Sequence, residues 1–247
     1  MAVATDYAAS VSGVAIRVTT LNSDGSLKPT ETYTSKSFIR VSFTPEYEEG
    51  DEITEKNADG TVCVSYKAPD TLKRVTMEIA VCDPDPVLSS LLSGGVLLAA
   101  GTPIAPVGWA SAKVGEDPSG DGVAVEVWSR AIVGGKPAQP NPYFHWVFPY
   151  VKTRLSGDRV IENGLLANTY EGFGLGNDAF GGGPDATGDT AWRWPDVTDR
   201  PYMYGRAQEA PIDAPRGIAN WSGGSGPVAI PFSDAVGPDD DIIAATP

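Results

Sequence analysis

The side chains best suited to catalysis or metal binding are few in this chain and lie far apart. The only histidine is His145, and the two cysteines are Cys63 and Cys82. Acyl transfer needs a nucleophile beside a base, and zinc needs three or four ligands that converge on one ion. Because His145 sits within the aromatic run of residues 143–150, we expect a packed, hydrogen-bonded side chain, with a catalytic base as the less favoured alternative.

Both cysteines fall in segments that alternate like β-strands, residues 61–67 and 73–82. A turn near residues 68–70 would pair these segments and place Cys63 opposite about Met77. In that register Cys63 and Cys82 are too far apart for a disulfide bond. Two cysteines in 247 residues are also no disulfide framework, so we predict free thiols in a reducing cytoplasm.

Two further patterns resemble ligand sites, but each lacks a required part. Glycines recur over residues 172–183, but residues 177–184 cannot supply the helix that a dinucleotide-binding loop requires, so we favour a bulge and sharp turns. The carboxylates of residues 46–59 fit the spacing of an EF-hand poorly, which favours a solvated loop over a calcium site. Glycoside hydrolysis needs only two carboxylates, but no feature selects a pair. We therefore predict a protein that is not an enzyme and has no cofactor or metal.

The composition is that of an acidic chain with many turns. Its 247 residues suit one all-β domain, or one domain with an appendage, and 28 glycines with 21 prolines favour turns over long helices. The net charge of −14 does not allow the chain to hold DNA by neutralising phosphates. Residues 1–7 lack the pattern of a signal peptide, and no segment approaches the roughly 18 apolar residues of a membrane-spanning helix. We therefore expect no membrane association.

Alternation of apolar and polar residues predicts that much of the chain is β-strand. An acidic segment, residues 45–60, interrupts this pattern, carries six net negative charges and ends in the hairpin-type turn Asp59-Gly60. The expected strands are residues 11–21, 37–44, 61–67, 73–82, 104–110, 123–133 and 140–150, followed by a hairpin of residues 151–161 with 165–173.

One short helix is expected over residues 84–93. Asp83 or Asp85 can cap its start, prolines fit its first turn, and Gly94 can end it in the left-handed conformation. A helix this short must be held by packing its apolar stripe against a sheet. The stripe consists of Val87, Leu88, Leu91 and Leu92.

From Gly181 onward the alternation ends, and Gly, Pro and Asp recur every few residues. We predict a β domain of residues 1–184 and an irregular C-terminal arm or subdomain of residues 185–247. The second part is too aromatic for a disordered tail, so we expect its aromatic side chains to anchor it on a surface. These anchors are Trp192, Trp194, Tyr202, Tyr204 and Trp221.

Three segments give the chain a resemblance to a known family. The first is the acidic hairpin of residues 46–73, which ends in Ala68-Pro-Asp-Thr-Leu-Lys73. The second is residues 75–95, with Asp83-Pro-Asp-Pro-Val-Leu-Ser-Ser-Leu-Leu92. The third is Pro142-Tyr-Phe-His-Trp-Val-Phe-Pro149 with the later Gly181-Gly-Gly-Pro184. From residue 11 to residue 184 the chain resembles the major tail (tail tube) protein of siphophages, particularly those of actinobacterial hosts.

The resemblance implies a mainly β, sandwich- or barrel-like tail tube fold with one short flanking α-helix and an extended, irregular C-terminal arm. Six subunits would close into a ring, and rings would stack into a tube through which DNA passes during ejection. The implied partners are other copies of the chain, the tape measure protein, and the tail terminator and distal tail proteins. The implied location is the tail of the virion, with the host cytoplasm during assembly.

We predict that the acidic hairpin, residues 45–72, is an arm that reaches a neighbouring ring, because its charge makes burial within its own subunit costly. A plain solvated loop is the alternative. Two other classes of function stay open, namely a β-sandwich carbohydrate-binding or adhesin module and, less favoured, a β-rich hydrolase. The candidate contact residues are Glu46, Tyr47, Glu48, Glu49, Asp51, Glu52, Ile53, Glu55, Asp59, Lys67, Asp70 and Lys73.

Overall fold

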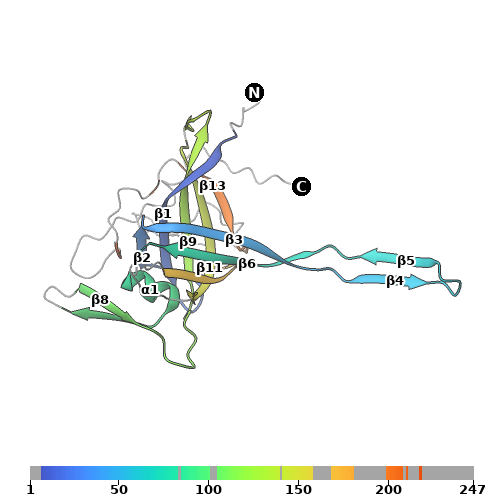
Figure 1. Ribbon diagram of the computed structural model, residues 1–247, viewed down its shortest axis with the longest axis horizontal. Coiled ribbons are helices and arrows are strands. Elements are labelled where there is room, and N and C mark those ends of the chain that lie inside the picture. The colour runs from blue at the N-terminus through green and yellow to red at the C-terminus, as the bar shows by residue number, and fades with distance from the viewer. Residues whose placement is uncertain are drawn as a thin grey trace.

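A computed structural model of the chain describes residues 7–82, 85–100, 105–139, 141–157, 168–180, 199–207, 210 and 217–218. Within these residues the protein is mainly β with one short helix, which confirms the predicted fold class (Figure 1). The elements are β1 (Ala9–Leu21), β2 (Leu27–Ser35), β3 (Phe38–Glu48), β4 (Glu52–Lys56), β5 (Val62–Lys67), β6 (Thr71–Val81), α1 (Pro86–Ser93), β7 (Val96–Ala100), β8 (Ala105–Ala110), β9 (Val123–Val133), β10 (Lys136–Pro137), β11 (Tyr143–Ser156), β12 (Asn168–Leu175), β13 (Met203–Ala207) and β14 (Gly217–Ile218).

Ten of the described strands form one antiparallel sheet. Its order is β14-β2-β1-β9-β11-β12-β6-β3, with β10 paired to β9 and β13 paired to β11. The other described strands form two separate hairpins, β4 with β5 and β7 with β8. The hairpin predicted for residues 151–173 is confirmed, because β11 pairs with β12 from Tyr150 opposite Leu175 to Ser156 opposite Thr169.

The large sheet curls so strongly that its end strand β3 comes back against β11 and β1. Although β12 and β6 separate β3 from β11 in the sheet order, the ring centroid of Phe43 in β3 lies 5.1 Å from that of Phe148 in β11. Farther along β3, the ring of Phe38 packs on Gly13 of β1, where an added Cβ would lie only 2.4 Å from the ring. The described strands β1 and β3 touch there but are not neighbours in the sheet, so it does not close into a barrel.

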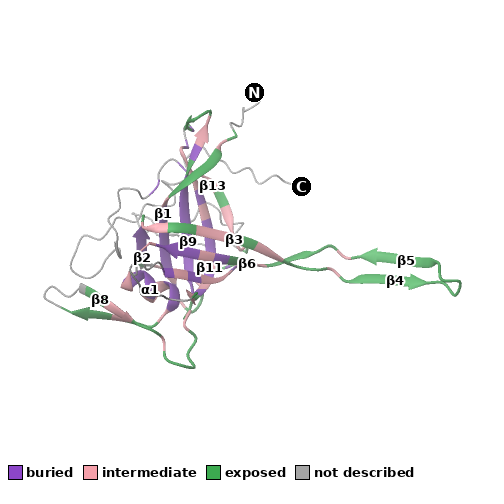
Figure 2. Ribbon diagram, in the orientation of Figure 1, coloured by how far each residue is buried: buried purple, intermediate pink, exposed green. Residues whose placement is uncertain are grey.

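The main core fills the inside of this curl (Figure 2). It joins side chains from both halves of the sheet, among them Ile16 of β1, Val125 of β9 and Ile79 of β6. The central strand β9 is buried on both faces, since every residue from Val123 to Ser129 is buried. The face of β9 that points away from the main core is therefore also covered. Polar side chains on that face must find hydrogen-bond partners inside the protein.

Helix α1 packs against the same core and confirms the predicted helix, with its first residue at Pro86. Asp85 caps the helix, because its carboxylate accepts hydrogen bonds from the backbone N–H groups of Val87 (2.8 Å) and Leu88 (3.1 Å). Ser89 is tied to the sheet by a hydrogen bond between its Oγ and the hydroxyl of Tyr170 (2.8 Å). Gly94 has the positive φ of the expected cap (61°) but a ψ of −152°, which is not the left-handed helical conformation.

Six strands, β2, β4, β7, β10, β13 and β14, were not predicted. β2 was missed because much of its buried surface is polar, including Thr32, Thr34 and Ser35. β13 and β14 lie beyond residue 181, where no strand was expected, so the prediction of irregular structure is wrong at these residues. Both join the main sheet, β13 on β11 and β14 on β2.

Candidate functional site: the projecting arm

The feature that most distinguishes this molecule is a two-stranded arm, residues 45–73, that extends far beyond the folded body (Figure 1). Every residue of β4 and β5, which form its tip, is exposed (Figure 2). A projecting hairpin is therefore present, and the twelve candidate contact residues all lie along it. Contact of this arm with a neighbouring ring stays a prediction.

The arm begins as a continuation of β3 and β6, which pair with each other up to Glu48 opposite Thr71. At this base the guanidinium of Arg74 donates to both carboxylate oxygens of Glu46, at 2.6 and 3.3 Å. The hydrogen bond from Arg74 holds the pKa of Glu46 below its ordinary value. A bidentate ion pair therefore stabilises the base of the arm.

The two halves of the arm, residues 45–50 and 68–73 at its base, come into close contact at Gly50. An added Cβ at Gly50 would lie 2.0 Å from the carbonyl oxygen of Ala68, so no other residue fits there without movement of the backbone. The backbone N–H of Gly50 donates to Asp70 Oδ1 at 3.1 Å, and the N–H of Ala68 donates to the carbonyl of Asp51 at 2.9 Å. These contacts join the base to the tip.

This crossing corrects the hairpin turn predicted near residues 68–70. β5 pairs with β4 rather than with β6, and Met77 lies opposite Phe43 and Gly172 instead of near Cys63. The acidic segment caused the error, since part of it forms β4 and so supplies the partner of β5. The predicted absence of a disulfide bond is nevertheless confirmed, because Cys63 and Cys82 are both free.

The tip ends in a tight turn at Asn57–Gly60. The N–H of Asn57 donates to the carbonyl of Thr61 at 2.7 Å, and both the N–H and the hydroxyl of Thr61 donate to Asp59 Oδ1, at 2.9 and 2.6 Å. These hydrogen bonds lower the pKa of Asp59. The tip is therefore an ordered hairpin with its own hydrogen bonds.

One face of the tip is an apolar stripe. Residues directly opposite in an antiparallel pair share a face, and Ile53 lies opposite Tyr66. Val64 and Val62 continue the same face of β5, whereas Glu52, Thr54, Ser65 and Lys67 form a polar reverse face. All four apolar side chains of the stripe are about half exposed: Ile53 54%, Val62 56%, Val64 49% and Tyr66 57%.

This stripe was not predicted from the sequence. Of the arm's apolar residues, Tyr47 and Ile53 were selected as contact candidates, although the alternation of Val62, Val64 and Tyr66 was visible. The stripe could have been recognised because no strand-like segment of the arm was expected to cover the face that carries Val62, Val64 and Tyr66. An apolar face on an isolated two-stranded ribbon is unusual in a monomer and is typical of an interaction surface.

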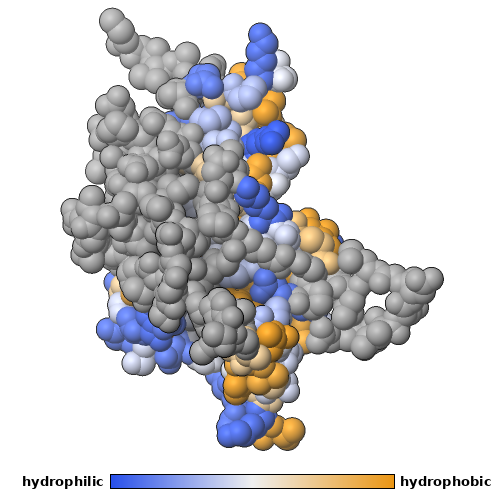
Figure 3. Space-filling model, turned by 90° about the vertical axis from the view of Figure 1, so that its left-hand side faces the viewer, coloured by the Kyte–Doolittle hydropathy of each residue, from blue (hydrophilic) through white to orange (hydrophobic). Residues whose placement is uncertain are grey.

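A second hairpin, β7 with β8, also exposes apolar residues, namely Val96 (62%), Leu98 (47%) and Val107 (64%). It lies near α1, at the opposite end of the body from the arm (Figure 1). The view from that side shows apolar residues gathered towards the lower end of the face (Figure 3). The described molecule therefore presents apolar surface at both ends.

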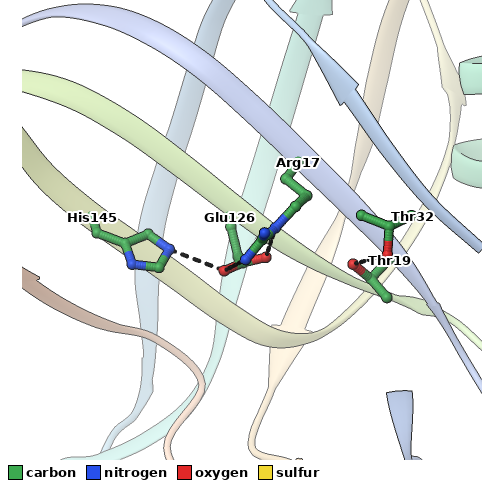
Figure 4. A network of polar contacts seen from close by, with 5 residues as sticks. All are labelled: Arg17, Thr19, Thr32, Glu126 and His145. Carbon is green, nitrogen blue, oxygen red and sulfur yellow. Dashed lines mark hydrogen bonds and ion pairs between the residues drawn. The ribbon is translucent and has the colours of Figure 1, made fainter. Parts of the chain in front are cut away.

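His145 is hydrogen-bonded to a buried ion pair, formed by Arg17 and Glu126 (Figure 4). Arg17 of β1 donates to both oxygens of Glu126 of β9, at 2.5 and 2.8 Å, and His145 Nε2 lies 3.0 Å from Glu126 Oε1. All three side chains are at most 2% exposed. The ring of His145 also stacks on Trp128, with centroids 4.3 Å apart.

The charges of this cluster follow from burial and contact. Burial alone would raise the pKa of Glu126, but the charge of Arg17 and the hydrogen bonds from His145 and Arg17 outweigh it and lower that pKa well below the ordinary value. Burial lowers the pKa of His145 more than the Glu126 carboxylate raises it. His145 is therefore a neutral, packed and hydrogen-bonded core residue, as predicted.

Of the five predicted aromatic anchors, Tyr202 and Tyr204 lie in the described part of the chain, and Trp192, Trp194 and Trp221 lie outside it. Tyr204 stacks on Trp146 of β11 with ring centroids 4.6 Å apart. The ring of Tyr202 lies 5.4 Å from that of Phe43 of β3. These contacts dock β13 on its own subunit's sheet.

Within the described ranges, no three His, Cys, Asp or Glu side chains gather closely enough to hold a metal ion. No helix in that part of the chain has the length and apolar character needed to cross a bilayer.

The chain matches no known family profile, and no curated protein resembles it in sequence. Among solved structures, it is similar to a chain in the cryo-EM structure of the anti-feeding prophage (AFP) baseplate, 6-fold symmetrised. The identity is 12%, the TM-score is 0.28, and the match covers 66% of this chain and 90% of the other. A likeness this weak carries no functional assignment.

Proposed function

We propose that this protein is a structural subunit of a bacteriophage tail that closes into hexameric rings, which stack into the tail tube. The observation that carries the proposal is the arm, whose half-exposed apolar stripe has no cover within the described part of its own subunit. Because apolar surface gains free energy when it leaves water, such an arm favours contact with another chain.

Self-assembly also suits the rest of the subunit. A surface that binds a different surface on the next copy produces a ring when the rotation closes and a filament when it does not. A net charge of −14 per subunit would keep DNA from adhering to a tube wall. The resemblance to siphophage major tail proteins supplies the ring number, the tape measure protein as the internal partner, and the tail terminator and distal tail proteins as partners at the two ends. No catalytic or cofactor-dependent activity is part of the proposal.

The test is the assembly state of the purified full-length protein. Sedimentation velocity over a rising concentration series and negative-stain microscopy should reveal rings or tubes roughly 100 Å across, the width expected when several domain-sized subunits close into a ring. A chain that remains monomeric at every concentration, and that is absent from the tails of virions, would contradict the proposal.

A carbohydrate-binding module is the second candidate, and one observation favours it. Tyr204 is 57% exposed and stacks on the half-buried Trp146 of β11, so the pair offers an aromatic platform on which a sugar ring could stack. Glycan-array binding that is lost in Tyr204→Ala, together with a monomeric protein, would favour this candidate over the tail subunit.

A further inference from the structure

An apolar groove runs along the line where the curled sheet fails to close. It has a volume of about 290 Å³ and lies between β3 on one side and β1, β9 and β11 on the other. Ile39, 57% exposed, and Arg40 stand among its lining residues. Its apolar lining includes Phe38, Val41, Phe43, Val127, Trp146 and Phe148.

The groove is open because β3 is an end strand of the sheet. Among the described strands, β3 pairs only with β6, and it meets β1 through the contact of Phe38 with Gly13 rather than through a ladder of hydrogen bonds. An end strand beside an apolar groove can accept an added strand, whose alternate side chains then fill the groove.

We infer that this groove receives the apolar stripe on the arm of a second copy of the chain. This inference rests on the proposed function and assigns a binding surface to the arm. The stripe from Val62 to Tyr66 is about 13 Å long, and the groove-lining part of β3 from Phe38 to Phe43 is about 17 Å long, at about 3.3 Å per residue. The stripe therefore fits within the groove.

The arm of the same subunit cannot fill the groove. β3 runs continuously from the groove at Phe38 into the base of the arm at Glu48, and it pairs with β6 along that length. The stripe consequently lies beyond the far end of this strand and points away from the body (Figure 1). Only another molecule can bring a stripe to this groove.

The charges of the two surfaces agree with this pairing. Among the described residues that line the groove, Arg40 is the only charged one, and its guanidinium is paired with Glu78 of β6. The arm carries six net negative charges over residues 45–60, and Glu55 lies on the stripe face, opposite Val64. The described lining of the groove carries no carboxylate that would repel the acidic arm, so the arm can approach it.

The test uses two exposed substitutions, Tyr66→Glu on the stripe and Ile39→Glu at the groove. Each variant alone should form no tubes at concentrations where the wild type does, and should sediment as particles no larger than a single ring. A 1:1 mixture of the two separately prepared variants should form particles of twice that size but no tubes, because the intact arm of Ile39→Glu can enter the intact groove of Tyr66→Glu. Two control variants should polymerise like the wild type. One is Thr54→Glu, on the polar face of the arm, and the other is Val114→Glu, at a fully exposed residue in a loop.

A mixture that forms no particles larger than those of either variant alone, or an Ile39→Glu variant that forms tubes normally, would overturn the inference. Cross-linking supplies a second measurement that does not depend on disrupting assembly. In a variant with Ile39→Cys, Val62→Cys, Cys63→Ser and Cys82→Ser, a short bis-maleimide should join the thiol at position 62, on the stripe of one copy, to the thiol at position 39 of another, seen as a mixed-isotope peptide pair. Polymers that cross-link only elsewhere would refute this groove and leave the tail subunit standing, whereas a wild type that never polymerises refutes the proposed function itself.

Discussion

At the scale of single residues, the ion pair between Arg17 and Glu126 places two opposite charges in the interior of the protein. Removing both charges from water is costly, and their attraction repays this only when the geometry is close and the remaining polar atoms are satisfied. Here the guanidinium makes two short hydrogen bonds to the carboxylate, and His145 contributes a third. The pair therefore fixes β1, β9 and β11 in one register.

Arg17→Met should destabilise the protein by about 3–5 kcal/mol, because it leaves the carboxylate of Glu126 buried without its cation. Adding Glu126→Gln should recover a large part of that loss, since the amide is neutral and still accepts from His145. Urea unfolding of the two single variants and the double variant measures the coupling. Equal losses in Arg17→Met and in the double variant would show that the ion pair is not a unit.

His145 makes stability depend on pH in a predictable direction. Its pKa is lowered in the folded protein, so below about pH 6.5 the unfolded chain binds a proton that the folded chain does not. The stabilisation is complete above that pH and is lost as the pH falls, by up to about 1.4 kcal/mol per pH unit. The lowered pKa of Glu126 adds a separate loss only below its ordinary range, near about pH 4.5.

The measurement is the free energy of unfolding between pH 7.5 and pH 5.5. Because His145 is the only histidine, the decline should vanish in His145→Gln, whose amide can still donate to Glu126. A decline of the same size in that variant would assign the pH dependence to other groups.

At the scale of elements, the arm depends on one close crossing. Gly50→Ala would place a Cβ against the carbonyl of Ala68, so the base and the tip should separate while the body keeps its fold. Because the crossing lies on the arm, outside the main core, we expect the global free energy of unfolding to change by less than about 1 kcal/mol. Proteolysis between residues 49 and 70 should accelerate several-fold. Thr54→Ala, exposed on the same arm, should resist proteolysis like the wild type.

The elements also show what can be read from the sequence. Strands with apolar alternation, such as β6 and β9, and a helix with a capping Asp85 were predicted from local patterns. β2 was not, because Thr32 and Thr34 are buried through neighbouring strands that the local pattern does not reveal. The pairing of β3 with β6 was missed for a related reason. It joins segments on either side of the acidic residues 45–60, and a pattern of alternation identifies strands without naming their partners.

At the scale of the whole molecule, two hairpins project from opposite ends of a body whose sheet is curled but open. The body has a continuous core and a satisfied buried ion pair, so its stability does not depend on the arm. The arm, in contrast, has only its own hydrogen bonds and half-exposed side chains, and a two-stranded ribbon is marginally stable alone. Folding and assembly should therefore be separable by removing the tip.

The cleanest deletion removes residues 51–67 and joins Gly50 to Ala68 through Asn-Gly. Gly50 and Ala68 already lie against each other, and the ion pair between Glu46 and Arg74 at the base of the arm is kept. Removing only residues 46–58 would instead leave β5 without its partner β4. Because every residue of β4 and β5 is exposed, the free energy of unfolding of the shortened protein should lie within about 1 kcal/mol of the wild-type value. The shortened protein should nevertheless form no tubes and sediment as particles no larger than a single ring. Full-length tubes from this variant would show that the arm is only a solvated surface. A loss of folding would instead place part of the stability of the body in the arm.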